Sequence, residues 1–251
     1  MSLRCVERSM ISKLSQSPAL VRFIPFAIFI VLTSLQEKFG DAGRYWIYFA
    51  KTLAGAGMLA VVWRHIEELK WRFSWEALVA GVAVFAVWVG LDGFYPRTEA
   101  LYSEHLCPLL KSLGLKKECV ASVAGAAWNP NEAFGTGSLL AVFFIIVRII
   151  GSSLVVPPLE EVFYRSFVYR YIASKEFLSV PIGKFLPVPF LVTALLFGFV
   201  HREWLAGILC AAAYQGLVIW KGRLGDAMTA HAITNFLLGL WVVWRGAWHF
   251  W

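Results

Sequence analysis

Residues 138–165 of this 251-residue chain read SLLAVFFIIVRIIGSSLVVPPLEEVFYR, and this stretch decides the fold. Its first part, up to Val156, holds one charged residue, Arg148, in an apolar run close to the roughly 20 residues that cross a bilayer. Its second part adds three charges directly after a Pro-Pro pair: Glu160, Glu161 and Arg165. Ionisable groups in apolar helices are expensive, so the stretch predicts a membrane span that carries a functional site.

The rest of the chain has the same character. It is 59% hydrophobic and 16% charged, whereas a soluble domain carries about 25% charged residues. The sequence therefore predicts an all-α, polytopic transmembrane helix bundle that forms a single integral membrane domain over residues 1–251. The net charge of +7 comes largely from short Lys/Arg runs beside apolar stretches, which are typical of orientation signals. We therefore expect the lipid bilayer as partner, and no nucleic acid.

Seven apolar stretches are candidate spans, and a shorter, less apolar helix is expected at 159–174. The candidates are 20–35, 46–63, 75–94, 138–156, 185–200, 204–220 and 227–244. This gives seven or eight membrane-embedded helices. A polar stretch, 95–137, interrupts the pattern and is predicted to be an interfacial insertion with a surface-lying helix. Cys107 and Cys119 lie in it, and they could form a disulfide or stay as free thiols.

The basic segments set the expected orientation. The N-terminus, 64–72, 175–184 and 221–223 are rich in Lys and Arg, which predicts a cytoplasmic location for each of them. Simple alternation of spans satisfies all of these only if 138–174 is one broken, partly re-entrant unit. Pro157 and Pro158 are the expected break and the start of a new helix, because proline removes a helical hydrogen bond.

Glu160 and Glu161, which follow this break, are expected to have different roles. Glu161 and Arg165 are four residues apart, the favoured spacing for a helical ion pair. Glu160 lies about 100° further round the helix, without a local partner. A carboxylate in poorly hydrated surroundings has a raised pKa, which suits a general base near neutral pH. Near a helix start, Glu160 would also be stabilised as an anion.

Two further groups lie on later spans. His231 and Asn235 share one helix face, and together they could donate two hydrogen bonds to one developing oxyanion. His201 could orient a water against Glu160. A hairpin with its turn at 176–184 would place His201 and Glu160 at similar depths, roughly 22–24 Å from the turn. His231 fits less well, because it is only roughly 9 Å along its helix from Gly225.

These motifs, Glu-Glu-x-x-x-Arg (160–165), Phe-x-x-x-His (197–201) and His-x-x-x-Asn (231–235), resemble the CAAX prenyl protease and bacteriocin-processing family. The resemblance implies an intramembrane glutamate protease with a catalytic helical core at 138–245. It implies that Glu160 and His201 activate water, His231 and Asn235 stabilise the oxyanion, and Glu161 and Arg165 support them. The stretch 91–96, Leu-Asp-Gly-Phe-Tyr-Pro, is similar to a bacterial exosortase-associated subgroup. We therefore expect a bacterial inner membrane protein that cleaves membrane-anchored proteins or peptides without a cofactor.

Two alternatives stay open at this point. Glu160, His201 and His231 could be three zinc ligands of a membrane metalloprotease, although the chain has no His-Glu-x-x-His motif. The chain could also be a non-catalytic binding or immunity protein that keeps the fold. In a purely structural role, His201 would be a residue at the membrane interface. His231 and Asn235 would form hydrogen bonds with neighbouring helices. For Arg148 we expect snorkelling or an ion pair with an acid such as Asp92.

Overall fold

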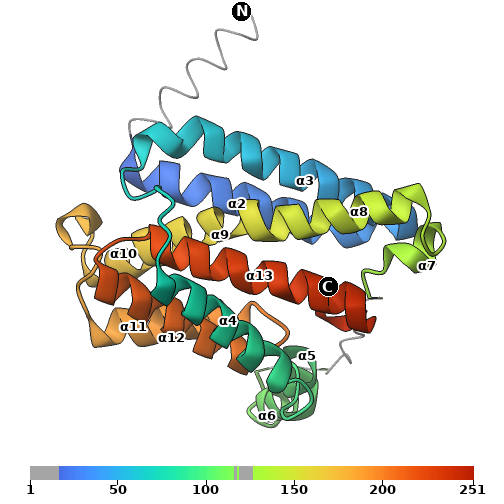
Figure 1. Cartoon of the computed structure of the whole chain (residues 1–251). Helices are drawn as coiled ribbons and strands as arrows, with labels where there is room; N and C mark the ends of the chain where they lie inside the picture. Colours follow the sequence, from blue (N-terminus) through green and yellow to red (C-terminus); the bar gives the residue numbers. More distant parts are fainter. Residues whose placement is uncertain (1–16, 116–117, 119–126) are drawn as a thin grey trace, which may run out of the picture.

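The computed structural model describes residues 17–115, 118 and 127–251, and this part of the chain is helical without any strand (Figure 1). Three long helices of the bundle are separated by the 95–137 insertion from the rest of the chain. The N-terminal helices are α2 (Pro18–Gln36), α3 (Gly40–Val62) and α4 (Trp75–Gly90). The later helices are α8 (Leu139–Ile150), α9 (Val156–Glu161), α10 (Tyr169–Ala173), α11 (Pro187–Phe199), α12 (Trp204–Lys221) and α13 (Gly225–Arg245). The all-α prediction is confirmed.

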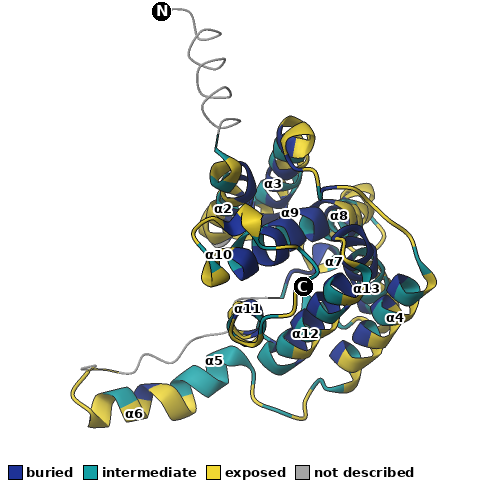
Figure 2. Cartoon of the chain, turned by 90° about the vertical axis from the view of Figure 1, so that its left-hand side faces the viewer, coloured by how far each residue is buried: buried dark blue, intermediate teal, exposed yellow. Residues whose placement is uncertain are grey.

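The outer faces of these helices are apolar. Leu139 is 90% exposed and Trp75 is 73% exposed, and the outward faces carry many more exposed Leu, Val, Ile and Phe side chains (Figure 2). Five helices are long and apolar enough to cross a membrane, and α4 and α11 are shorter apolar helices. Apolar surface on this scale is stable only against lipid. The protein is therefore an integral membrane protein.

The expected break at Pro157 and Pro158 is wrong. Residues Leu139–Ala173 form one helix of 35 residues that runs straight through both prolines. Two π-helical segments flank them, Gly151–Val155 and Val162–Val168. Wider π turns accommodate the missing N–H groups and the proline rings that a regular α-helix would reject. Glu160 consequently lies inside a long helix, and the expected stabilisation by a helix N-terminus does not apply.

This continuous helix removes the conflict in orientation. The basic segments meet at one end of the bundle, where Arg22 of α2 and Arg170 of α10 both bind Glu68. At the same end, Gly225 packs against the backbone of Lys70 and Arg72. A single crossing between Ser138 and Ser174 brings the described basic segments 64–72, 175–184 and 221–223 to this end. The positive-inside rule predicts that it is cytoplasmic.

The 95–137 insertion lies at the opposite end, with α5 (Thr98–Ala100), α6 (Cys107–Ser112) and α7 (Pro130–Phe134) (Figure 1). The Thr98 hydroxyl donates to the His201 carbonyl at 2.6 Å, and Arg202 pairs with Glu99 at 2.8 Å. The insertion is therefore fastened beside the end of α11. Cys107 is buried and disulfide-bonded, whereas Cys119, the partner that the sequence suggests, lies outside the described residues.

Small residues allow two close helix contacts in the bundle. A Cβ atom on Gly81 of α4 would lie 2.6 Å from the Ala230 carbonyl oxygen of α13. A Cβ on Gly198 of α11 would lie 2.3 Å from a side-chain carbon of Ile208 on α12. Lipid gives apolar helices no hydrophobic reason to associate, so such close van der Waals packing stabilises the bundle. These contacts fix the depth of α13 against α4 and of α11 against α12.

We predict that Glu68→Gln destabilises the fold, because it leaves Arg22 and Arg170 buried without their carboxylate. Burial raises the pKa of Glu68, but Arg22, the Ser166 hydroxyl and Arg170 outweigh it, so the pKa lies below its ordinary value. A carboxyl with a lowered pKa stabilises the folded state above its unfolded pKa of about 4.3, and this contribution disappears as the pH falls through the folded pKa.

The measurement is thermal unfolding of purified protein in detergent between pH 7 and pH 3. Glu68→Gln should lose about 3 kcal/mol of stability at pH 7 and show a flatter decline towards acid than the wild type. Glu67→Gln, which changes the exposed neighbouring carboxylate, is the matched control. Equal unfolding temperatures for the two variants at pH 7 would contradict the prediction.

Candidate active site

A fully buried carboxylate lies at the centre of the site. Glu161 has no exposed surface, and its Oε2 lies 3.1 Å from Nε of Arg165, which is equally buried. Its Oε1 lies 2.9 Å from Nδ1 of His231 on α13. A carboxylate can only accept, so Nδ1 of His231 carries a proton and donates it to Glu161. The predicted Glu161–Arg165 pair is present, and the structure extends it to a third member.

The side chain of Glu160 lies apart from this group. It is 13% exposed, and its Oε2 atom is buried without a hydrogen bond. The nearest ionisable partner is Nε2 of His231 at 4.0 Å, beyond hydrogen-bonding distance. A water molecule beside these two atoms could form a hydrogen bond with both the Glu160 carboxylate and Nε2 of His231. Glu160 is thus available for work that Glu161, held on both oxygens, cannot perform.

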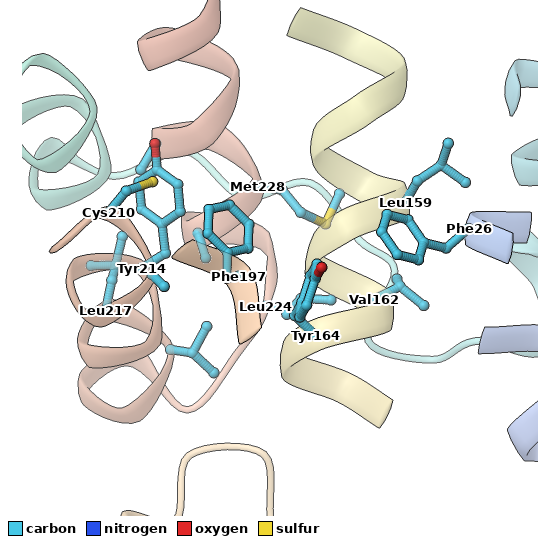
Figure 3. Packing of buried hydrophobic residues seen from close by; sticks show 14 of the residues in the cluster. Phe26, Leu159, Val162, Tyr164, Phe197, Cys210, Tyr214, Leu217, Leu224 and Met228 are labelled. Atoms are coloured by element: carbon cyan, nitrogen blue, oxygen red, sulfur yellow. The ribbon is translucent and has the colours of Figure 1, made fainter. Parts of the chain in front are cut away.

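Aromatic rings fix the orientation of the charged groups. The ring of Tyr214 on α12 stacks on His231 with centroids 5.2 Å apart. The Arg165 guanidinium lies 4.6 Å from the centroid of Phe197 on α11. Figure 3 shows Phe197 and Tyr214 close together, opposite the helix that carries Leu159. Neither aromatic contact was predicted, because each joins residues that are far apart in the chain.

His201 lies at the end of α11 and is anchored through one ring nitrogen. Its Nδ1 lies 2.6 Å from the carbonyl oxygen of Phe197, one turn earlier. The carbonyl can only accept, so Nδ1 carries the proton and the neutral ring keeps a lone pair on Nε2. Trp88 of α4 packs edge-on against the ring at 5.6 Å. His201 and Glu160 form no direct hydrogen bond or ion pair with each other.

Asn235 lies one turn after His231 on α13. Its Nδ2 donates to the carbonyl oxygen of Ser152 at 2.8 Å. That carbonyl lies in the π-helical segment before Pro157, where the regular hydrogen-bond pattern is broken. The contact holds the amide in place and uses one of its two N–H groups.

All four residues line one cavity of about 420 Å³: Glu160, His201, His231 and Asn235. Helices α9, α11 and α13 thus bring together side chains that span 76 positions of the sequence. Glu161 and Arg165 are not among the lining residues and lie behind the wall. The cavity also reaches Arg202 and Glu203 at the end that carries the insertion. The arrangement therefore separates groups that face the cavity from groups that hold them.

The expected mismatch in depth does not keep His231 away from Glu160. The turn before α13, with Gly222 and Gly225, borders the same surface pocket as Arg170 and as Pro181 of the turn before α11. His231 nevertheless reaches the cavity that Glu160 lines, with its Nε2 4.0 Å from the Glu160 carboxylate.

The lining residues that were not predicted as part of the site include two cations inside apolar helices, Lys51 and Arg148. Lys51 was not singled out from the sequence at all, although a lysine inside an apolar span is a signal in itself. The expected Arg148–Asp92 pair does not occur: Asp92 binds Arg97 at 3.2 Å and His249 at 2.8 Å.

The donors for the zinc alternative are not arranged as a metal site. In the described part of the chain, no three His, Cys, Asp or Glu side chains are grouped so that they could hold a metal ion. One nitrogen of His231 is engaged by Glu161, and one nitrogen of His201 by a carbonyl oxygen. The polar groups instead combine a carboxylate, two imidazoles and an amide around a cavity, which is a set suited to acid–base chemistry and oxyanion binding.

Comparison with known proteins agrees with this arrangement. Residues 136–237 match the family model described as type II CAAX prenyl endopeptidase, Rce1-like. The matched segment holds Glu160, Glu161, Arg165, His201, His231 and Asn235. No curated protein and no solved structure matches the chain. The resemblance predicted from the sequence is thereby confirmed over residues 136–237, which are similar to the Rce1-like family of CAAX prenyl endopeptidases.

Proposed function

We propose that the protein is an intramembrane endopeptidase that uses Glu160 as a general base on water. The family supports an endopeptidase that acts on membrane-associated proteins. The single observation that carries the mechanism is the shared cavity lined by Glu160, His201, His231 and Asn235. The exosortase-associated subgroup and the bacterial inner membrane stay predictions of the sequence.

In the first step, a water molecule is activated and attacks the peptide bond. The Glu160 carboxylate takes a proton from water, and the resulting hydroxide attacks the carbonyl carbon of the scissile bond. Nε2 of His201 accepts a hydrogen bond from the same water and orients it, because Nδ1 is committed to the Phe197 carbonyl. Glu160, now protonated, gives the proton to the leaving amine as the tetrahedral intermediate collapses. The carboxylate is restored and two peptide products leave.

The second step concerns the charge that develops on the carbonyl oxygen. Glu161 accepts the Nδ1 proton of His231 and fixes the ring, and Nε2 donates to the developing oxyanion when it also carries a proton. The remaining N–H of Asn235 is one turn away. Two donors held by Glu161 and by the Ser152 carbonyl need no rearrangement when the oxyanion forms. Such preorganised donors typically stabilise a transition state by about 3 kcal/mol each.

We expect Glu160→Gln to abolish cleavage while the protein stays folded and inserted. Glutamine keeps the size of the side chain but cannot take a proton, so the rate should fall at least about 100-fold. Newly formed peptide termini would be quantified by mass spectrometry in membranes of cells that express either protein at matched abundance. Glu132→Gln, an exposed carboxylate of α7, is the matched control and should retain all products. Wild-type turnover in Glu160→Gln would remove the mechanism.

The same experiment separates the alternatives. A non-catalytic binder predicts identical termini and identical phenotypes for wild type, Glu160→Gln and Glu160→Ala. A zinc enzyme predicts stoichiometric zinc in the purified protein, with activity lost to a chelator and restored by zinc.

We further predict that Arg165→Met lowers abundance and stability as well as activity. Removing one partner of a buried ion pair leaves an uncompensated charge, at a cost of about 3–5 kcal/mol. Arg165→Lys keeps the charge and should recover part of the loss. The measurements are the amount of inserted protein and its thermal unfolding in detergent. Wild-type abundance and unfolding temperature for Arg165→Met would show that Arg165 does not stabilise Glu161.

A further inference from the structure

A pocket of about 430 Å³ opens at the end of the bundle that carries the basic turns, and it shares no lining residue with the candidate active site. It lies where the segment before α4 meets the turns before α11 and α13. Four basic side chains line it against two acidic ones: Lys70, Arg72, Arg170 and Arg223 against Glu67 and Glu68. The pocket therefore has a net positive charge, at the end that the positive-inside rule predicts to be cytoplasmic.

Two of the four cations are held by carboxylates. Glu68 accepts hydrogen bonds from Arg170 and from Arg22 of α2, so these three side chains together keep one positive charge. Arg223 forms an ion pair with Asp226 of α13, which leaves no net charge. These two groups join α2, α10 and α13 at the wall of the pocket and hold its shape.

Lys70 and Arg72 are the cations that remain available to a ligand. Both are exposed, and neither side chain forms a hydrogen bond or an ion pair with any residue that the structure describes. Their backbone is nevertheless fixed against α13. A Cβ atom on Gly225 would lie 2.1 Å from the Lys70 carbonyl oxygen, and the Thr229 hydroxyl donates to the Arg72 carbonyl oxygen at 2.7 Å. Two free cations on one fixed segment can bind a single phosphate together.

Exposed aromatic side chains alternate with these two cations along residues 70–75. Trp71 is 45% exposed, Phe73 is 69% exposed and Trp75 is 73% exposed. Aromatic rings beside Lys and Arg are typical of the membrane–water interface, where the rings lie among the lipid headgroups and the cations meet phosphates. The segment therefore places Lys70 and Arg72 at the depth of the headgroups.

An apolar groove of about 560 Å³ runs between α4 and α12, which pack against each other (Figure 1). Val79 and Ala80 line it from α4, and Ala213 and Gly216 line it from α12. A Cβ atom on Gly216 would meet no atom within 4 Å, so the groove is open at this position. From Trp220 to Ala213 it follows seven residues of α12, or about 10 Å. An acyl chain that runs along the helices fits such a groove.

The pocket and the groove meet at one salt bridge. Lys221, at the end of α12, binds Glu76 of α4 at 2.9 Å. Glu76 lines the groove and lies four residues after Arg72, whereas Gly222 lines the pocket and directly follows Lys221. A molecule with an anionic head and an apolar tail would therefore reach both at once.

We propose that this pocket and groove bind one anionic phospholipid of the cytoplasmic leaflet. Lys70 and Arg72 bind its phosphate, and one acyl chain lies between α4 and α12. A zwitterionic lipid brings a cation of its own to this place, which Lys70 and Arg72 repel, so charge selects the anionic headgroup. A helix from a second copy of the chain would fill the groove but would leave both cations without an anion. This site is independent of the proposed function.

The test measures lipid binding to the full-length protein, purified in detergent, by native mass spectrometry. Dioleoylphosphatidylglycerol, which is anionic, is compared with dioleoylphosphatidylcholine, which has the same acyl chains. The anionic lipid should form a one-to-one complex at least about tenfold more tightly. An excess of inorganic phosphate should not displace it, because phosphate has no acyl chain. Displacement would show that the pocket binds a free anion, and equal binding of the two lipids would contradict the proposal.

Charge variants locate the headgroup. Lys70→Gln and Arg72→Gln should each weaken binding of the anionic lipid about fivefold and leave binding of phosphatidylcholine unchanged. Arg64→Gln, an exposed cation at the same end that does not line the pocket, is the matched control. Thermal unfolding checks that each variant is folded. An equal loss in Arg64→Gln and Arg72→Gln would show that diffuse surface charge, not this pocket, attracts the lipid.

A second pair of variants locates the acyl chain. Gly216→Leu fills the groove without changing any charge, and it should weaken binding of both lipids. Gly57→Leu, at an equally open position on the outward face of α3, should weaken neither. Unchanged lipid binding in folded Gly216→Leu would remove the groove from the proposal. A dimer that forms without lipid and is lost in Gly216→Leu would assign the groove to a second copy of the chain instead.

Discussion

The site depends on one buried carboxylate, Glu161, which is held by Arg165 on its own helix and by His231 on α13. Each of these charges would be intolerable in lipid alone, and together they are stable only in one helix arrangement. Because Arg165 is local, it would form its contact in many packings. The bond to His231 ties α13 to the long helix, together with the bond from Asn235 to the Ser152 carbonyl. The chemistry of the cavity follows from these two contacts.

The neighbouring residues Glu160 and Glu161 differ in their surroundings. Glu161 is covered, bound on both oxygens and removed from the cavity, and it determines which nitrogen of His231 carries a proton. Glu160 is its neighbour, but the helical turn directs it to the cavity, where its Oε2 has no hydrogen bond. The Glu-Glu pair thus places one carboxylate behind the cavity wall and the other at the cavity, within one turn of the helix.

Periodicity and hydropathy predicted what depends on local sequence. The positions of the spans, the Glu161–Arg165 pair and the shared face of His231 and Asn235 follow from helix geometry alone. The predicted break at Pro157 was wrong. Proline usually interrupts a regular α-helix, but the sequence does not show that an adjacent π-helical turn will accommodate the proline ring. The contacts of His231 with Glu161 and of Arg148 with three aromatic rings join distant segments, and only tertiary packing reveals them.

The unbroken helix has a consequence for the position of the site. Continuity through Pro157 brings the basic turns of the described chain to one end, and the positive-inside rule assigns that end to the cytoplasm. The cavity extends the other way, towards Arg202, Glu203 and the insertion that holds the disulfide-bonded Cys107. A disulfide persists in an oxidising compartment, so charge and cysteine chemistry independently give the same orientation. Both arguments predict that the polar end of the cavity lies on the side away from the cytoplasm.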